Sequence, residues 1–136
     1  MSPVLKNGNV VMINHFIYNI KNPSRGDIAA FQKDGGDLYS VKRIVGLPGE
    51  TVQIKEGELL INGKPLKEEY ASDIGYAGTA SEPVKLGKEE YFFLGDNDTA
   101  SDDSREKAIG KIKKKDIYGK VWFVIKPWSE IGFVSD

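Results

Sequence analysis

The apolar residues of this chain fall in short runs and not in a sustained helical stripe. No window of a dozen residues keeps the spacing of an amphipathic helix, whereas runs rich in Val, Ile, Tyr and Phe alternate with segments containing Gly and Pro. The pattern predicts strands at Val10–Ile13, His15–Ile20, Asp27–Phe31, Leu38–Val45, Thr51–Ile54, Glu58–Ile61, Glu90–Leu94 and Tyr118–Ile125. The chain is therefore predicted to be mostly β.

Turn-forming residues separate these runs. Leu47-Pro48-Gly49 and Glu56-Gly57 are typical turn sequences, and Asn62-Gly63 tolerates the positive φ angles of a two-residue hairpin. Antiparallel hairpins are therefore expected to dominate the topology. The polar, small residues 67–88 predict a surface excursion, and 111–116 could form one helical turn.

Length and composition narrow the class of protein. The 136 residues, 40% of them hydrophobic, fit one domain over 1–136 with a core. A net charge of −1 lacks the basic surface of a nucleic-acid binder, so no nucleic-acid partner is expected. No Cys and one His exclude a thiol nucleophile and disfavour a His-based triad, and no cofactor or metal is implied. Catalysis would need hydroxyl, amine or carboxylate groups.

Two cations follow each other in the predicted strand 38–45. Side chains alternate along a strand, so Lys42 shares a face with Ser40 while Arg43 points to the opposite face. If one face is buried, one of the two cations is drawn into apolar surroundings. Arginine stays charged there, but lysine can lose its proton and become a general base. The alternative is a solvent-facing lysine at a sheet edge.

A dense polar loop follows the apolar run 91–94. Its sequence, from Gly95 to Arg105, is rich in Asp, Asn and Ser, whose side chains hydrogen-bond to nearby backbone N–H groups. Arg105 could clamp one of the carboxylates. The alternative is a plain structural turn or a weak cation loop, although the glycine and glutamate that an EF-hand requires are not at the right offsets from Asp96.

Four segments, taken together and in order, resemble the sequence boxes of bacterial type I signal peptidases. They are Met1–Leu5, Arg25–Phe31, Val41–Glu50 and Gly95–Arg105. Each box alone is unspecific, but four in the family's order over nearly the whole chain are specific. The resemblance implies antiparallel β-sheets in the architecture shared with repressor-cleavage domains. It also implies a membrane-anchored serine endopeptidase that removes signal peptides from exported preproteins.

The resemblance also implies roles for individual residues. Lys42 would be the general base of a Ser–Lys dyad, and Ser101 would hold its amine. Asp103 and Arg105 would form a salt bridge that braces the polar loop, and Asp96 would help to anchor the loop. A lysine amine can accept the proton of a serine hydroxyl and later protonate the leaving amine, so this chemistry requires no histidine.

The family's substrate lies extended beside the catalytic strand, with small side chains at two alternate positions. By resemblance, Ser40 and Val41 would line this groove together with Met1 and Leu5. The implied partners are signal peptides and the membrane surface. The implied location is the bacterial cell membrane, with one span in the parent protein and the catalytic domain on the extracytoplasmic side.

Two departures from the family pattern qualify these expectations. The family's nucleophilic Ser immediately precedes the Met that aligns with Met1, so residues 1–136 alone are expected to be inactive; Ser2 aligns with a variable position and is no substitute. Asp98 stands where the family commonly has Arg. Two alternatives stay open: a naturally noncatalytic relative that binds secreted chains or assists surface assembly, and a self-cleaving repressor domain, although no DNA-reading segment is visible.

Overall fold

The structure of the chain is a computed structural model that describes residues 10–14, 16–33, 39–96, 103–125 and 131–133. Its strands are β1 (Val10–Asn14), β2 (Ile28–Phe31), β3 (Ser40–Gly46), β4 (Thr51–Lys55), β5 (Glu58–Ile61), β6 (Lys64–Pro65), β7 (Val84–Lys85), β8 (Glu90–Leu94), β9 (Ile112–Lys113), β10 (Ile117–Ile125) and β11 (Ile131–Phe133). Its short helices are α1 (Ile17–Ile20), η2 (Glu69–Ala71), η3 (Gly78–Ser81) and η4 (Lys114–Asp116).

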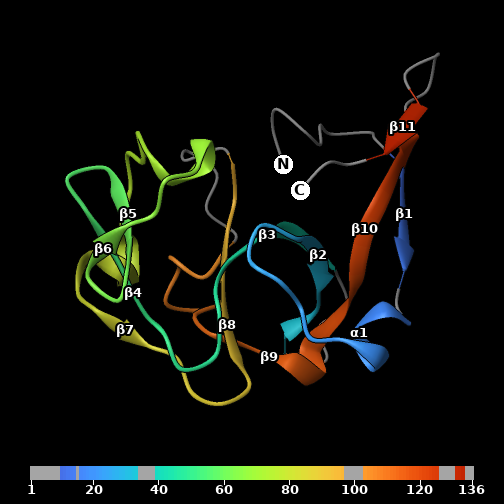
Figure 1. Cartoon of the computed structure of the whole chain (residues 1–136), viewed down its shortest axis with the longest axis horizontal. Helices are drawn as coiled ribbons and strands as arrows, with labels where there is room; N and C mark the ends of the chain where they lie inside the picture. The colour runs from blue at the N-terminus through green and yellow to red at the C-terminus, as the bar shows by residue number, and fades with distance from the viewer. Residues whose placement is uncertain (1–9, 15, 34–38, 97–102, 126–130, 134–136) are drawn as a thin grey trace.

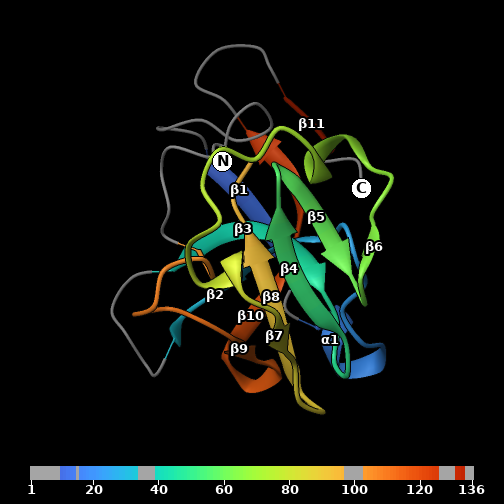
Figure 2. The same cartoon turned by 90° about the vertical axis from the view of Figure 1, so that its left-hand side faces the viewer.

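The strands form two antiparallel sheets. The larger has the order β1-β10-β2-β3-β8-β9, with β11 also paired to β10, and the smaller has the order β6-β5-β4-β7. The two sheets lie side by side, with β3 and β8 of the larger sheet next to the smaller one (Figures 1 and 2). The mostly β, antiparallel fold class predicted from the sequence is confirmed.

Two tight turns build the smaller sheet. Glu56 and Gly57 have φ angles of 53° and 78°, and Asn62 and Gly63 have 52° and 83°. Positive φ at both central residues is the conformation that matches the twist of paired strands. These turns join β4 to β5 and β5 to β6, so the hairpin predicted at Asn62-Gly63 is confirmed.

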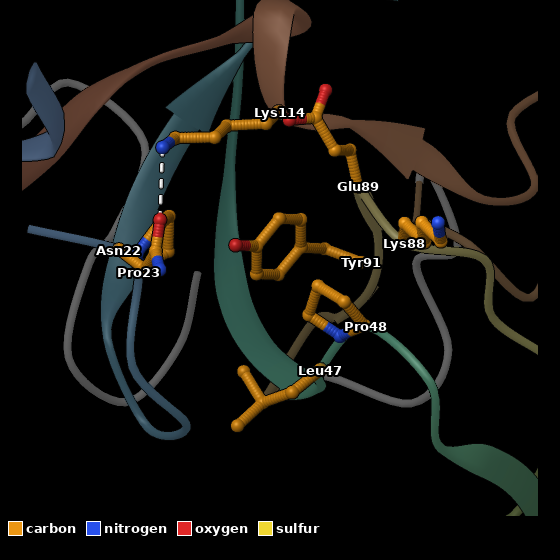
Figure 3. A pocket seen from close by; sticks show the side chains of 8 residues that line it. All are labelled: Asn22, Pro23, Leu47, Pro48, Lys88, Glu89, Tyr91 and Lys114. Atoms are coloured by element: carbon orange, nitrogen blue, oxygen red, sulfur yellow. Dashed lines mark hydrogen bonds between the residues drawn. The ribbon is translucent and has the colours of Figure 1, made fainter.

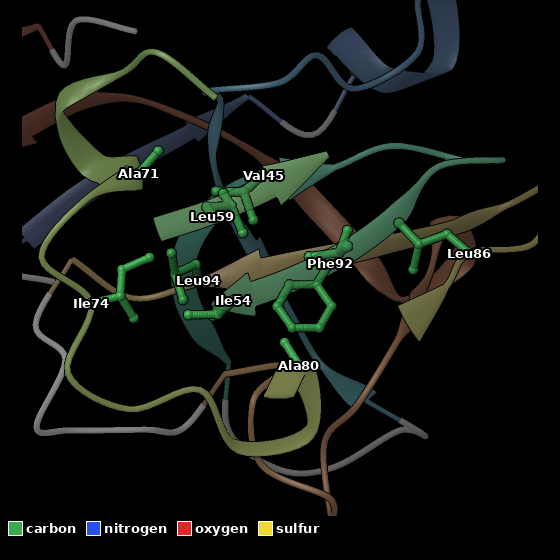
Figure 4. Packing of buried hydrophobic residues seen from close by; sticks show 10 residues of the cluster. Val45, Ile54, Leu59, Ala71, Ile74, Ala80, Leu86, Phe92 and Leu94 are labelled. Atoms are coloured by element: carbon green, nitrogen blue, oxygen red, sulfur yellow. The ribbon is translucent and has the colours of Figure 1, made fainter. Parts of the chain in front are cut away.

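Strand β3 is buried on both faces near its end. Val45 packs into the cluster between the two sheets, together with Phe92 and Leu94 of β8 (Figure 4). Ile44, on the other face, packs into a second cluster with Phe93. β3 therefore packs into two hydrophobic cores. This packing fixes the strand and so the positions of its other side chains.

Several elements differ from the predicted ones. The predicted strand His15–Ile20 is wrong where the structure describes it, because Ile17–Ile20 is the helical turn α1. The Asn14 side-chain oxygen accepts hydrogen bonds from the backbone N–H groups of Phe16 and Ile17 and turns the chain there. The short strands β6, β7, β9 and β11 were not predicted. Of the helical turn predicted at 111–116, only 114–116 is helical, as the 3-10 turn η4, and 112–113 is the strand β9.

Residues 67–88 are only partly a surface segment. Their charged side chains are mostly exposed, as expected. Ala71, Ile74, Ala80 and Leu86, however, are buried members of the cluster between the sheets (Figure 4). Small side chains in this segment let the backbone lie close against the smaller sheet. The sequence prediction looked for bulky apolar residues and therefore did not detect this packing.

Candidate active site

Lys42 lies on β3 opposite Ala29 of β2, and its side chain reaches Gly95, the first residue after β8. A Cβ added to Gly95 would lie 3.6 Å from the Lys42 amine and 3.3 Å from Asp103 Oδ2. Gly95 therefore lies against both groups, and a side chain there would press most closely on the carboxylate. In the part of the chain that the structure describes, the half-buried Lys42 amine has no hydrogen-bond or ion-pair partner.

The Asp103 carboxylate is held rigidly in the interior. Its side chain and that of Arg105 are both 0% exposed, and Arg105 Nη2 lies 2.8 Å from Asp103 Oδ2. Arg105 Nε contacts both carboxylate oxygens at 3.0 and 3.1 Å, and the Gly95 N–H donates to Oδ2 at 2.7 Å. A buried ion pair is tolerated when its remaining hydrogen-bonding positions are satisfied, as they are here. Asp103 and Arg105 thus fix the end of the polar loop.

Further hydrogen bonds attach this loop end to its neighbours. The Ser104 Oγ accepts from the Phe93 N–H at 2.9 Å, and the Ser104 N–H donates to the Phe93 carbonyl at 3.0 Å. On the other side, the Thr79 N–H donates to the Arg105 carbonyl at 2.9 Å. A Cβ at Gly78 would lie only 2.3 Å from that carbonyl oxygen, so glycine is required at this approach. The loop end is therefore clamped between β8 and η3.

Arg43 and Asp96 form a second ion pair on the opposite face of β3. Arg43 is 7% exposed; its Nη2 lies 3.2 Å from Asp96 Oδ2, and its Nη1 donates to the Gly26 carbonyl at 2.9 Å. The guanidinium also stacks 4.7 Å above the Tyr70 ring. Of the two successive cations, Arg43 is the more deeply buried and is fully paired. Lys42 is the one whose charge is not committed to a partner.

The first half of β3 offers a partly open edge. On one side Ser40, Val41 and Lys42 pair with β2, but β8 pairs with β3 only from Arg43 onward. Within the described residues, no strand covers the β8 side of Ser40–Lys42. An uncovered strand edge can pair with an extended peptide through its backbone groups.

A third paired group supports the turn at the end of β3. Arg25 forms two bonds to the Glu50 carboxylate, at 2.6 and 2.7 Å, and Arg25 also donates to the Val45 carbonyl. The hydrogen bond to Glu50 raises the pKa of Arg25. Burial acts to raise the pKa of Glu50, but the bonds from Arg25 and from the Leu47 N–H outweigh it and hold that pKa below its ordinary value.

Sequence reasoning located part of this arrangement. It named Ser40, Val41, Lys42, Asp96, Asp103 and Arg105, and the structure places all of them around β3 and the end of β8. The other named residues, Met1, Leu5 and Ser101, lie outside the described residues, as does Asp98.

The sequence analysis assigned no role to two other buried polar residues, Arg43 and Asp27. Arg43 was considered only as the alternative to Lys42 for the buried cation. Its place in the family-like segment Val41–Glu50 was the signal that could have identified it. The buried Asp27, which accepts from the Tyr18 hydroxyl at 2.8 Å, was assigned no role; its place in the family-like segment Arg25–Phe31 was the available signal.

Two features are absent from the ranges that the structure describes. No three His, Cys, Asp or Glu side chains there come together as a metal-ion site. No helix within those ranges has both the length and the apolar character needed to cross a membrane.

The chain is similar to known proteins in both sequence and fold. The family model described as signal peptidase, peptidase S26, matches residues 1–128. The chain is 37% identical to signal peptidase I of Bacillus licheniformis and 39% identical to signal peptidase I S of Bacillus subtilis, covering 96% of this chain and 74% of each relative. A crystal structure of a signal peptidase I from Enterococcus faecalis superposes with a TM-score of 0.61 and 34% identity, covering 74% of this chain and 97% of that one. The chain belongs to the signal peptidase family, peptidase S26.

Proposed function

We propose that this protein is a membrane-associated serine endopeptidase that removes signal peptides from exported proteins, with Lys42 as its general base. Family membership supports signal-peptide removal by a serine peptidase. The observation that supports the choice of Lys42 is its amine, which lies beside Gly95 and the fixed Asp103 carboxylate without a described ion-pair partner. A lysine that is not committed to an ion pair can give up and accept a proton.

The proposed reaction needs one hydroxyl and one neutral amine. The amine of Lys42 takes the proton of the nucleophilic serine as the serine oxygen bonds to the scissile carbonyl carbon. The resulting ammonium then protonates the leaving amine as the peptide bond breaks. Lys42 next takes a proton from the water that attacks the acyl-enzyme, and returns that proton to the serine oxygen as the ester bond breaks. In this proposal the serine immediately precedes Met1, and residues 1–136 alone do not cleave.

The surrounding residues receive positioning and binding roles. Ser101 is proposed to hold the Lys42 amine through its hydroxyl. Asp103 and Arg105 are proposed to keep the polar loop in place, and their buried ion pair supports this role. Asp96 is proposed to anchor the start of the same loop through Arg43.

The proposed substrate lies extended along the open edge of β3. Backbone pairing with Ser40 and Val41 would supply affinity, and Met1 and Leu5 would line the same groove. The uncovered β8 side of these residues supports this placement. Small side chains at alternate positions of the substrate would select the cleavage site.

The remaining proposals concern the whole protein. Residues 1–136 are proposed to be one domain on the extracytoplasmic side of the bacterial cell membrane, which the parent protein crosses once. Signal peptides and the membrane surface are its proposed partners. A net charge of −1 supports a partner other than nucleic acid.

Substitution of Lys42 in the protein that carries the upstream serine tests this function. Lys42→Ala is expected to slow cleavage of a preprotein by at least about 100-fold, because general-base catalysis by a positioned group contributes about that much or more. Lys64→Ala, on the exposed strand β6, is the matched control and should process the preprotein normally. Circular dichroism should show that both variants are folded. Undiminished cleavage by Lys42→Ala would remove Lys42 from the mechanism.

A further inference from the structure

A pocket of about 380 Å³ lies at the end of β3 that is remote from Lys42 (Figure 3). Leu47 and Pro48, which follow β3, form one wall, and Lys114 of η4 reaches across it toward Asn22. Leu47 is five residue steps along the chain from Lys42, or roughly 16 Å at about 3.3 Å per residue. The pocket is therefore distinct from the candidate active site.

The Tyr91 side chain lies in the middle of this pocket, and its hydroxyl points toward Asn22 and Pro23 (Figure 3). Tyr91 is 2% exposed, yet no residue in the described ranges forms a hydrogen bond with its hydroxyl. Burial, and to a lesser degree the charge of Glu89, raise the pKa of Tyr91, so the hydroxyl keeps its proton at neutral pH. Buried hydroxyls normally form a hydrogen bond, and this one is not engaged by a described residue, so it is available to donate to a bound group.

The other polar groups around the pocket are mainly donors. Lys114 Nζ donates to Asn22 Oδ1 at 2.9 Å and has further N–H groups to offer. Lys88 adds a second positive charge, and among the described residues that line the pocket only Glu89 is acidic. Lys113, Lys115 and Asp116 lie near Lys114 in the sequence but are not among the described residues that line the pocket. The lining therefore complements an anionic group that accepts hydrogen bonds.

We propose that this pocket is a second binding site, which takes a carboxylate group. In this assignment the Tyr91 hydroxyl donates to the carboxylate from the floor of the pocket, and Lys114 and Lys88 balance its charge. Leu47 and Pro48 contact the carbon chain that carries the carboxylate. The ligand class is an acidic side chain of a peptide or a small free carboxylic acid. The site is independent of Lys42 and of the proposed peptidase function.

Titration of ¹⁵N-labelled protein with two probes tests this proposal. The probes are glutarate and the peptide acetyl-Ala-Glu-Ala-amide, and the neutral peptide acetyl-Ala-Gln-Ala-amide is the control. Saturable shifts of the Tyr91 and Leu47 amide signals are expected with the acidic probes and not with the neutral peptide. Tighter binding of the acidic peptide than of glutarate would assign the site to a polypeptide ligand, and the reverse to a free acid.

Two variants distinguish a specific carboxylate site from nonspecific electrostatic attraction of the acidic probes to surface lysines. Tyr91→Phe keeps the ring in the core and removes only the hydroxyl, so it should fold and bind the acidic probe about tenfold more weakly. Lys114→Met should weaken binding by a similar factor, whereas Lys64→Met, on β6, should not. Equal binding by Tyr91→Phe and the unaltered protein, equal binding of the neutral peptide, or the absence of saturable shifts would overturn the proposal.

Discussion

Removal of the negative charge of Asp103 leaves the Arg105 guanidinium buried without its partner. Both side chains are fully buried, so water cannot replace the lost interaction. Asp103→Asn is therefore expected to lower the free energy of unfolding by about 3–5 kcal/mol, the usual cost of breaking one side of a buried pair. Urea denaturation measures this change. Glu82→Gln, at an exposed position, should change stability by less than about 0.5 kcal/mol, and an equally small effect of Asp103→Asn would contradict the account.

The Arg25–Glu50 pair predicts a pH dependence with a defined sign. Because the folded protein holds the pKa of Glu50 below its unfolded value, the pair stabilises the fold fully above the unfolded pKa of about 4.3. This stabilisation is lost as the pH falls through the lower, folded pKa. Glu50→Gln should therefore cost about 1–2 kcal/mol near neutral pH and progressively less in acid. Urea unfolding of both proteins across this range measures the difference, and a cost that does not change with pH would refute the assignment.

At the scale of elements, Gly46 controls how closely β3 approaches the smaller sheet. A Cβ at this position would lie 2.6 Å from Val52 Cγ2 and 2.9 Å from both Leu86 Cδ1 and Phe92 Cβ. Gly46→Ala is expected to destabilise the fold by about 1–3 kcal/mol through overpacking. Thermal unfolding compares it with Gly49→Ala, which has open space but a φ of +84° and should lose only about 1 kcal/mol through backbone strain. A smaller loss for Gly46→Ala than for Gly49→Ala would argue against this packing.

Elements were predictable where local chemistry decides the conformation. The run 117–125 and the turn at Asn62-Gly63 follow directly from apolar periodicity and from the positive φ that the turn requires. Ile17–Ile20 looks like a strand by composition, but the Asn14 side chain captures two backbone N–H groups and starts a helical turn. The two-residue strand β9 exists only because it pairs with β8, which no local pattern records.

At the scale of the whole molecule, the site depends on contacts between distant segments. Alternation placed Lys42 and Arg43 on opposite faces of β3, but it could not say which is paired, because β3 packs into cores on both faces. The proximity of Lys42, Gly95 and Asp103 joins residues more than fifty positions apart. Family resemblance named Lys42 and Asp103 as parts of one site, but neither it nor sequence periodicity predicted that Lys42 lies against Gly95.

The amine at position 42 is proposed to perform the chemistry. Residues 1–136 contain no cysteine, so Lys42→Cys introduces a unique thiol in this part of the chain that bromoethylamine can convert into a lysine-like amine. In the protein that carries the upstream serine, Lys42→Cys should fail to process a preprotein, and aminoethylation should restore processing. Full activity of unmodified Lys42→Cys, or no recovery after complete aminoethylation of a folded sample, would contradict the account.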